Sequence, residues 1–171
     1  VYVPAKDMAA VLKAKTIYSE AAGEFRYSLG LWGPDGVAEG RINEWAFNGR
    51  TRLMVKSVDY DRQHPQHPDK TAATATVQIR NATNRPVNYA CGITGGPRTY
   101  YLYLDGADNT YEYSGEVSGF PGGDGILLLP GAAITFKVPA VIPNGVKVNR
   151  FVTQFLGDGR LERPFKIFLD H

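Results

Sequence analysis

The chain has 171 residues, of which 43% are hydrophobic and 21% charged, and this composition is typical of a folded domain rather than a disordered segment. The formal net charge of +2 comes from 19 basic and 17 acidic residues that are interspersed along the chain, so we expect no nucleic-acid partner. No apolar run approaches the about 20 residues that cross a bilayer, so no membrane span is expected. Cys91 is the single cysteine, which excludes an internal disulfide and favours a buried thiol.

The N-terminal part predicts a short amphipathic helix over residues 5–15, because Met8, Val11 and Leu12 recur there at helical spacing. Two strand-like pieces follow at 16–21 and 24–32. A segment rich in turn residues then separates this part from the remainder of the chain. We therefore expect a helix-bearing segment over residues 1–40 and a second domain over residues 41–171.

The second part predicts an antiparallel β-sandwich. Short strands alternate with turn clusters, and no long helical period intervenes. In residues 74–81 the alternation is clean, with Ala75, Val77 and Ile79 on the buried face. The expected strands lie at 51–60, 74–81, 87–90, 99–104, 110–114, 126–129, 133–139, 148–156 and 165–169.

Turn and core positions in this part resemble the immunoglobulin-like sandwiches of unknown function found on bacterial lipoproteins and secreted antigens. The likeness covers about Phe47 to Leu169 and implies an immunoglobulin-like fold outside the cytoplasm, with nothing specified about activity. The residues that carry it are Asn81, Asp105, Gly106, Leu128, Pro130, Gly131, Val138 and Pro139.

The first residues resemble the latter half of a bacterial cell-surface stalk module named after the copper amine oxidase N-terminal domain. The likeness implies that residues 1 to about 32 are part of such a stalk unit, packed onto the sandwich. No cofactor is expected, since residues 1–15 hold no His or Cys that would bind copper. The matching apolar positions are Val1, Val3, Pro4, Met8, Leu12 and Ile17.

Two sets of residues are candidates for ligand binding. His64 and His67, flanked by Asp61 and Asp69, are metal-ligand types in one loop, although the alternative is a solvated loop stiffened by its prolines. A hairpin over residues 100–113 predicts a ladder in which Tyr103 faces Tyr111 and Tyr101 faces Tyr113. On an outer face this ladder is a stacking platform for a sugar or an apolar side chain, and on an inner face it is core.

The hairpin loop also offers oxygen atoms to calcium from Asp105, Asp108 and Asn109, but these residue types are common in any tight loop. The sequence contains no nucleophile elbow, phosphate-binding loop, dinucleotide-binding turn or zinc-protease helix motif.

We therefore expect no catalytic residues, and a non-catalytic extracytoplasmic or cell-surface bacterial domain for adhesion, spacing or binding of a surface protein or glycan. One alternative is a carbohydrate-binding module using the tyrosine ladder. Another is an enzyme that depends on a metal or on the Cys91 thiol.

Overall fold

The computed structural model describes residues 36–61, 69–90, 100–114, 117–120 and 125–170, together with the backbone of two strands at 14–19 and 24–29. These residues are strands and turns without a helix, and so hold no helix long and apolar enough to cross a membrane. The helix expected over 5–15 falls outside the described residues up to residue 13. Its last two residues, Ala14 and Lys15, belong instead to strand β1 (Ala14–Ser19), which pairs antiparallel with β2 (Glu24–Leu29).

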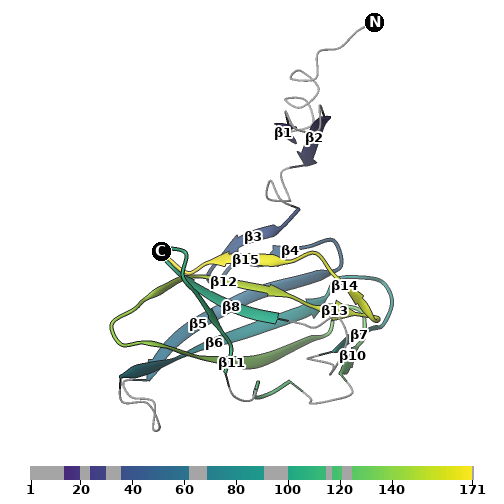
Figure 1. Ribbon diagram of the computed structural model, residues 1–171. Helices are drawn as coiled ribbons and strands as arrows, with labels where there is room; N and C mark the ends of the chain where they lie inside the picture. The colour runs from purple at the N-terminus through teal and green to yellow at the C-terminus, as the bar shows by residue number, and fades with distance from the viewer. Residues whose placement is uncertain are drawn as a thin grey trace, which may run out of the picture.

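The main body has two facing layers of strands (Figure 1). One layer contains the sheet in the order β11-β6-β5-β4. Its strands are β4 (Ala46–Phe47), β5 (Thr51–Asp61), β6 (Lys70–Asn81) and β11 (Ala133–Pro143). Residues at alternate positions of β6, including Ala75, Val77 and Ile79, are fully buried, which confirms the predicted inner face.

The facing layer contains the sheet in the order β3-β15-β12-β8-β9. Its strands are β3 (Ala38–Arg41), β8 (Tyr100–Asp105), β9 (Thr110–Glu112), β12 (Val148–Gln154) and β15 (Phe165–Phe168). The β3–β15 pair is parallel, so the expectation of an entirely antiparallel sandwich is wrong at this edge. The expected boundary at residue 40 falls inside β3, a strand of this sheet.

A smaller sheet in the order β10-β7-β13-β14 closes one end of the body. Its strands are β7 (Val87–Ala90), β10 (Ile126–Leu128), β13 (Leu156–Gly157) and β14 (Arg160–Leu161). The chain enters this sheet from β12 through Phe155, which is fully buried and packs edge-on against Tyr101 and Phe165. The same stretch of chain therefore joins the large sheet to the small one.

Asn81 joins the two turns that connect β6 and β11 to the small sheet. Its side-chain amide donates hydrogen bonds to the carbonyl oxygens of Arg85 and Leu128, at 2.7 and 2.9 Å. Its own carbonyl accepts from the backbone N–H of Gly131, at 2.9 Å. Gly131 has a φ of 76°, a conformation that glycine adopts without the steric cost of a side chain. Asn81, Leu128 and Gly131, which are among the residues that carry the resemblance to immunoglobulin-like sandwiches, are thus close in space and stabilise the fold.

Candidate functional site

The tyrosine ladder has the predicted register but not an exposed position. Tyr103 pairs with Tyr111, and the Tyr113 N–H donates to the Tyr101 carbonyl. Tyr101 and Tyr103 are 1% and 0% exposed, whereas Tyr113 is 41% exposed. A stacking platform needs open ring faces, so the four tyrosines do not form one; the inner-face alternative is the one that the structure shows.

The Tyr103 hydroxyl joins the two layers of the sandwich. It accepts a hydrogen bond from the backbone N–H of Ala75, at 3.0 Å, and donates one to the carbonyl of Val138. Ala75 and Val138 are partners in the β6–β11 ladder, so the hydroxyl enters the opposite sheet between two of its strands. Burial raises the pKa of Tyr103 well above its ordinary value, and the phenol stays protonated.

The predicted metal site lies mostly beyond the described residues. His64 and His67 are outside them, as is Cys91. Asp61 ends β5, and Asp69 precedes β6, where its backbone carbonyl accepts from the Asn144 N–H. In the part of the chain that the structure describes, no three His, Cys, Asp or Glu side chains gather as metal ligands would.

In the candidate calcium loop, the carboxylate oxygens of Asp105 accept hydrogen bonds from donors of the same hairpin. Asp105 Oδ1 accepts from the N–H groups of Ala107 and Asn109, and Oδ2 accepts from the Asn109 side-chain amide and the Tyr111 hydroxyl. The amide of Asn109, with these other donors, holds the pKa of Asp105 below its ordinary value. Asp108 instead forms an ion pair with Arg150. The loop is therefore organised by protein groups that occupy the Asp105 oxygens.

A buried polar cluster made of Asn48, Thr51, Tyr89 and Glu162, here called the Glu162 cluster, lies at the end of the body closed by the small sheet. Glu162 is 6% exposed, and its Oε2 accepts from Asn48 Nδ2 at 3.0 Å and from Thr51 Oγ1 at 2.7 Å. Thr51 Oγ1 also lies 2.6 Å from the Tyr89 hydroxyl oxygen. Since Thr51 has one hydroxyl proton and gives it to the carboxylate, Tyr89 is the donor in that second bond.

Asn48 ties the cluster to the turn between β4 and β5. Its Oδ1 accepts from the N–H groups of Arg50 and Thr51, at 3.0 and 2.8 Å. Its Nδ2 donates to Glu162 and to the Arg163 carbonyl, the latter at 3.1 Å. All the hydrogen-bonding capacity of this buried amide is used, so the turn and residues 162–163 are held together by one side chain.

The other oxygen of Glu162 has a different environment. Oε1 is buried and accepts no hydrogen bond from the described residues, and Arg50 Nε lies 3.6 Å away. This oxygen rests against the backbone of Gly157, where a Cβ atom would overlap it. Burial raises the pKa of the neighbouring Tyr89 to about 12, so that phenol is neutral near pH 7.

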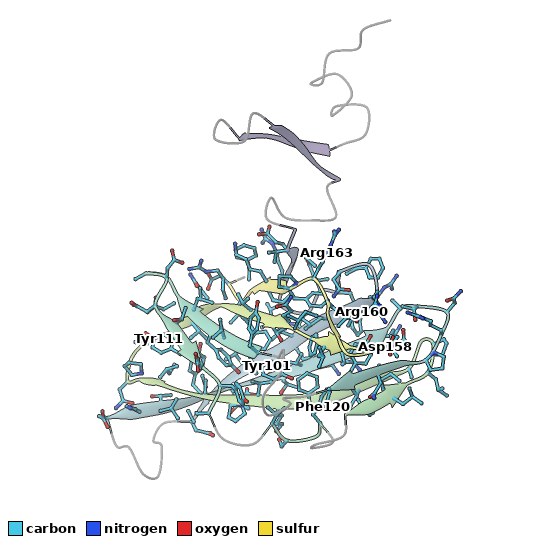
Figure 2. The ribbon with its side chains drawn as sticks, turned by 45° about the vertical axis from the view of Figure 1, so that its right-hand side comes forward. Tyr101, Tyr111, Phe120, Asp158, Arg160 and Arg163 are labelled. Atoms are coloured by element: carbon cyan, nitrogen blue, oxygen red, sulfur yellow. The ribbon has the colours of Figure 1, made fainter. Side chains whose placement is uncertain are left out.

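Arginine side chains surround the cluster on its solvent side. Arg50 Nη2 pairs with Asp158 Oδ2 at 2.7 Å, and Arg85 Nη2 lies 3.7 Å from the same oxygen. The backbone N–H of Asn88, together with Arg50, lowers the pKa of Asp158. Figure 2 shows Asp158, Arg160 and Arg163 on the side of the body away from Tyr111.

A cavity of about 380 Å³ opens beside these side chains. We call it the arginine pocket; its lining residues are Asn48, Gly49, Arg50, Arg160, Leu161, Glu162 and Arg163. Its size lies within the range of about 300–1,000 Å³ that is usual for small-molecule sites. Three arginines and one carboxylate line the cavity, so its lining carries an excess of positive charge and is suited to negatively charged groups.

The fold and this pocket define a two-layer β-sandwich with a charged cavity at one end. No protein-family model and no curated protein matches the chain. Among solved structures, it is similar to an uncharacterized β-sandwich protein from Clostridium difficile, with 12% identity, 78% of this chain and 95% of that chain covered, and a TM-score of 0.46. It is also similar to a putative ApaA protein from Bordetella pertussis, with 17% identity, coverage of 75% and 92%, and a TM-score of 0.43.

Sequence reasoning missed the Glu162 cluster and the arginine pocket. Asn48 and Glu162 are 114 positions apart, and the segment around Glu162 is rich in charge and turn residues, as solvated loops are. The one local clue is a density of arginines at 160 and 163 beside a glutamate. Periodicity could not have identified this glutamate as buried, because it lies outside any alternating strand.

Proposed function

We propose that the chain is a non-catalytic, immunoglobulin-like β-sandwich domain of an extracytoplasmic bacterial protein, and that it acts in spacing and ligand binding. One observation carries this proposal: the buried hydroxyls of Tyr103 and Tyr89 and the Oε2 atom of Glu162 are hydrogen-bonded to other parts of the fold. Such groups stiffen a domain. A nucleophile or general base must instead keep a reactive atom directed at open space.

The rigid body favours a role in presenting a surface. The two layers are joined by the hydrogen bonds of the Tyr103 hydroxyl as well as by apolar packing. Buried aromatic rings also pack edge-on against one another, Tyr103 against Phe151 and Phe155 against Phe165. A domain that spaces or displays a binding site needs this stiffness, because each side chain ordered in advance lowers the entropic cost of binding.

Antibody labelling of intact cells tests the proposed location and role. An antibody raised against the folded domain, used on cells of the organism that encodes it, should label unbroken cells, and added protease should remove the label. A cytoplasmic marker antibody serves as the control for leakage. Labelling that appears only after lysis would contradict the extracytoplasmic placement.

A further inference from the structure

We propose that the arginine pocket binds an oxyanion group, that is, a phosphate, sulfate or carboxylate, carried by an external ligand. This inference deepens the proposed function, on which it rests for its biological setting, by giving the ligand class of a binding domain. The lining of the pocket carries more positive than negative charge. Arg50, Arg160 and Arg163 line the cavity, and Glu162 is the acid among its lining residues.

The carboxylate of Glu162 leaves the pocket positive. Its Oε2 accepts two hydrogen bonds, from Asn48 and Thr51, and its Oε1 lies near Arg50 Nε and against Gly157. The 6% exposure of Glu162 keeps this negative charge inside the fold. Arg160 and Arg163, by contrast, are exposed residues of the pocket lining.

The hydrogen-bond donors of the pocket lining suit an oxyanion. A guanidinium presents parallel N–H groups that match two oxygens of an oxyanion, which makes arginine the residue suited to bidentate recognition of phosphate and carboxylate. Arg160 forms no ion pair with any residue that the structure describes, whereas Arg50 is paired with Asp158. Arg160 therefore supplies a guanidinium for the oxyanion, and Arg50 lines the same cavity.

The segments that carry Arg50 and Arg163 are held in place by hydrogen bonds. The Asn48 amide bonds the turn at Gly49 and Arg50 to the segment at Glu162 and Arg163, at distances of 2.8–3.1 Å for four separate hydrogen bonds. Gly49 has a φ of 100°, a conformation open to glycine, which lets the chain turn sharply at the rim. The two arginine-bearing walls are thus fixed before any ligand arrives.

The test is an NMR titration of the ¹⁵N-labelled 171-residue chain with sodium phosphate, sodium sulfate and sodium acetate, each at constant ionic strength set with sodium chloride. We expect saturable shifts of the backbone amides of Arg50 and of residues 160–163. A preference for phosphate and sulfate over acetate assigns a tetrahedral oxyanion, and the reverse preference assigns a carboxylate. Shifts that fail to saturate, or that chloride alone reproduces, would overturn the proposal.

A pair of charge-matched variants locates the site. Arg160→Gln with Arg163→Gln removes two positive charges from the pocket, and Lys56→Gln with Lys137→Gln removes two exposed charges from elsewhere on the body. The first variant should weaken binding by about tenfold or more, and the second by less than about twofold. Equal losses in both would show non-specific attraction and would refute the pocket.

Two further readouts keep the result interpretable. The spectrum of each variant reports whether it is folded, and Arg160→Gln alone should weaken binding in the same direction if the double variant loses structure. The titration is done on purified protein, so it is independent of cell location. Failure of binding with surface labelling intact refutes the ligand class alone, and binding without surface labelling refutes the proposed setting alone.

Discussion

The two buried tyrosines Tyr103 and Tyr89 show how differently one residue type is used at the centre and at the end of this molecule. At the centre, the Tyr103 hydroxyl bonds to the N–H of Ala75 and the carbonyl of Val138, two residues that are partners in the β6–β11 ladder. At the end, the Tyr89 hydroxyl bonds to Thr51, which in turn bonds to the Glu162 carboxylate. The centre thus depends on packing and backbone order, whereas the end depends on a network of side chains around one charge.

The largest expected effect comes from the packed centre. Phe151 is fully buried and lies in ring contact with Tyr101 and Tyr103, at centroid distances of 6.2 and 5.2 Å. Phe151→Ala should lower the free energy of unfolding by about 3–5 kcal/mol, through lost burial and the cavity left behind. Urea denaturation measures this. Phe168→Ala, at a half-buried position, should cost clearly less, and equal losses would contradict the assigned core.

Removal of the hydroxyl at the centre should have the next effect. Tyr103→Phe leaves the Ala75 N–H and the Val138 carbonyl without this partner inside the core. Each buried polar group left unsatisfied costs about 1–3 kcal/mol, so the unfolding midpoint should fall distinctly. Tyr113→Phe is the matched control, since Tyr113 is exposed and should be close to neutral. A Tyr103→Phe variant as stable as the control would remove the inter-sheet bond from the account.

At the charged end, steric crowding should have a measurable cost. A methyl group at Gly157 would overlap Oε1 of Glu162, which is buried and cannot move aside without disturbing Asn48 and Thr51. Gly157→Ala should therefore destabilise the protein by about 1–3 kcal/mol. Gly106→Ala is the control, because its nearest neighbour, Asn149 Nδ2, would lie at an ordinary 3.7 Å. Thermal unfolding of both variants decides the point.

The smallest effect should be an acid sensitivity that comes from the carboxylates of Asp105 and Asp158. The pKa values of Asp105 and Asp158 are lower in the folded chain, through hydrogen bonds led by the Asn109 side chain and the Asn88 N–H respectively. As the pH falls, the unfolded chain therefore takes up protons before the folded chain does. The stability that the two lowered pKa values contribute is present above about pH 3.9 and is lost as the pH falls through the folded-state pKa values. Denaturation between pH 5 and pH 2 should show a shallower loss in Asp158→Asn than in the wild type. An unchanged slope would contradict the pairing.

The strands were predictable from the sequence where an alternating face is buried. Val77 and Ile79 lie inward as their pattern indicated, and the Tyr103–Tyr111 register followed from the hairpin loop. Which face of that hairpin is buried did not follow, because a row of tyrosines suits either face until the opposite sheet is placed. The β3–β15 pair was missed for a related reason, since the four residues of β3 carry no clear alternation.

The Glu162 cluster could not be predicted, because its members come from the β4–β5 turn, β5, β7 and the segment after β14, which only the folded topology brings together. Local sequence reasoning assigns a glutamate between two arginines to solvent, and burial here depends on Asn48 and Thr51 being in place. The turn residues around Asn81 show the opposite case, because turn chemistry is local and can be recognised from residue type.

The most direct test of the account is a double-mutant cycle on Thr51→Val and Glu162→Ala, measured as free energy of unfolding in urea. The buried carboxylate of Glu162 clamps two strands and a turn together through the Thr51 hydroxyl, at 2.7 Å. Each single variant should therefore be destabilised, and the two should be coupled by about 1–3 kcal/mol. Additive losses, with no coupling between the two positions, would contradict the claim that Glu162 serves as a structural clamp.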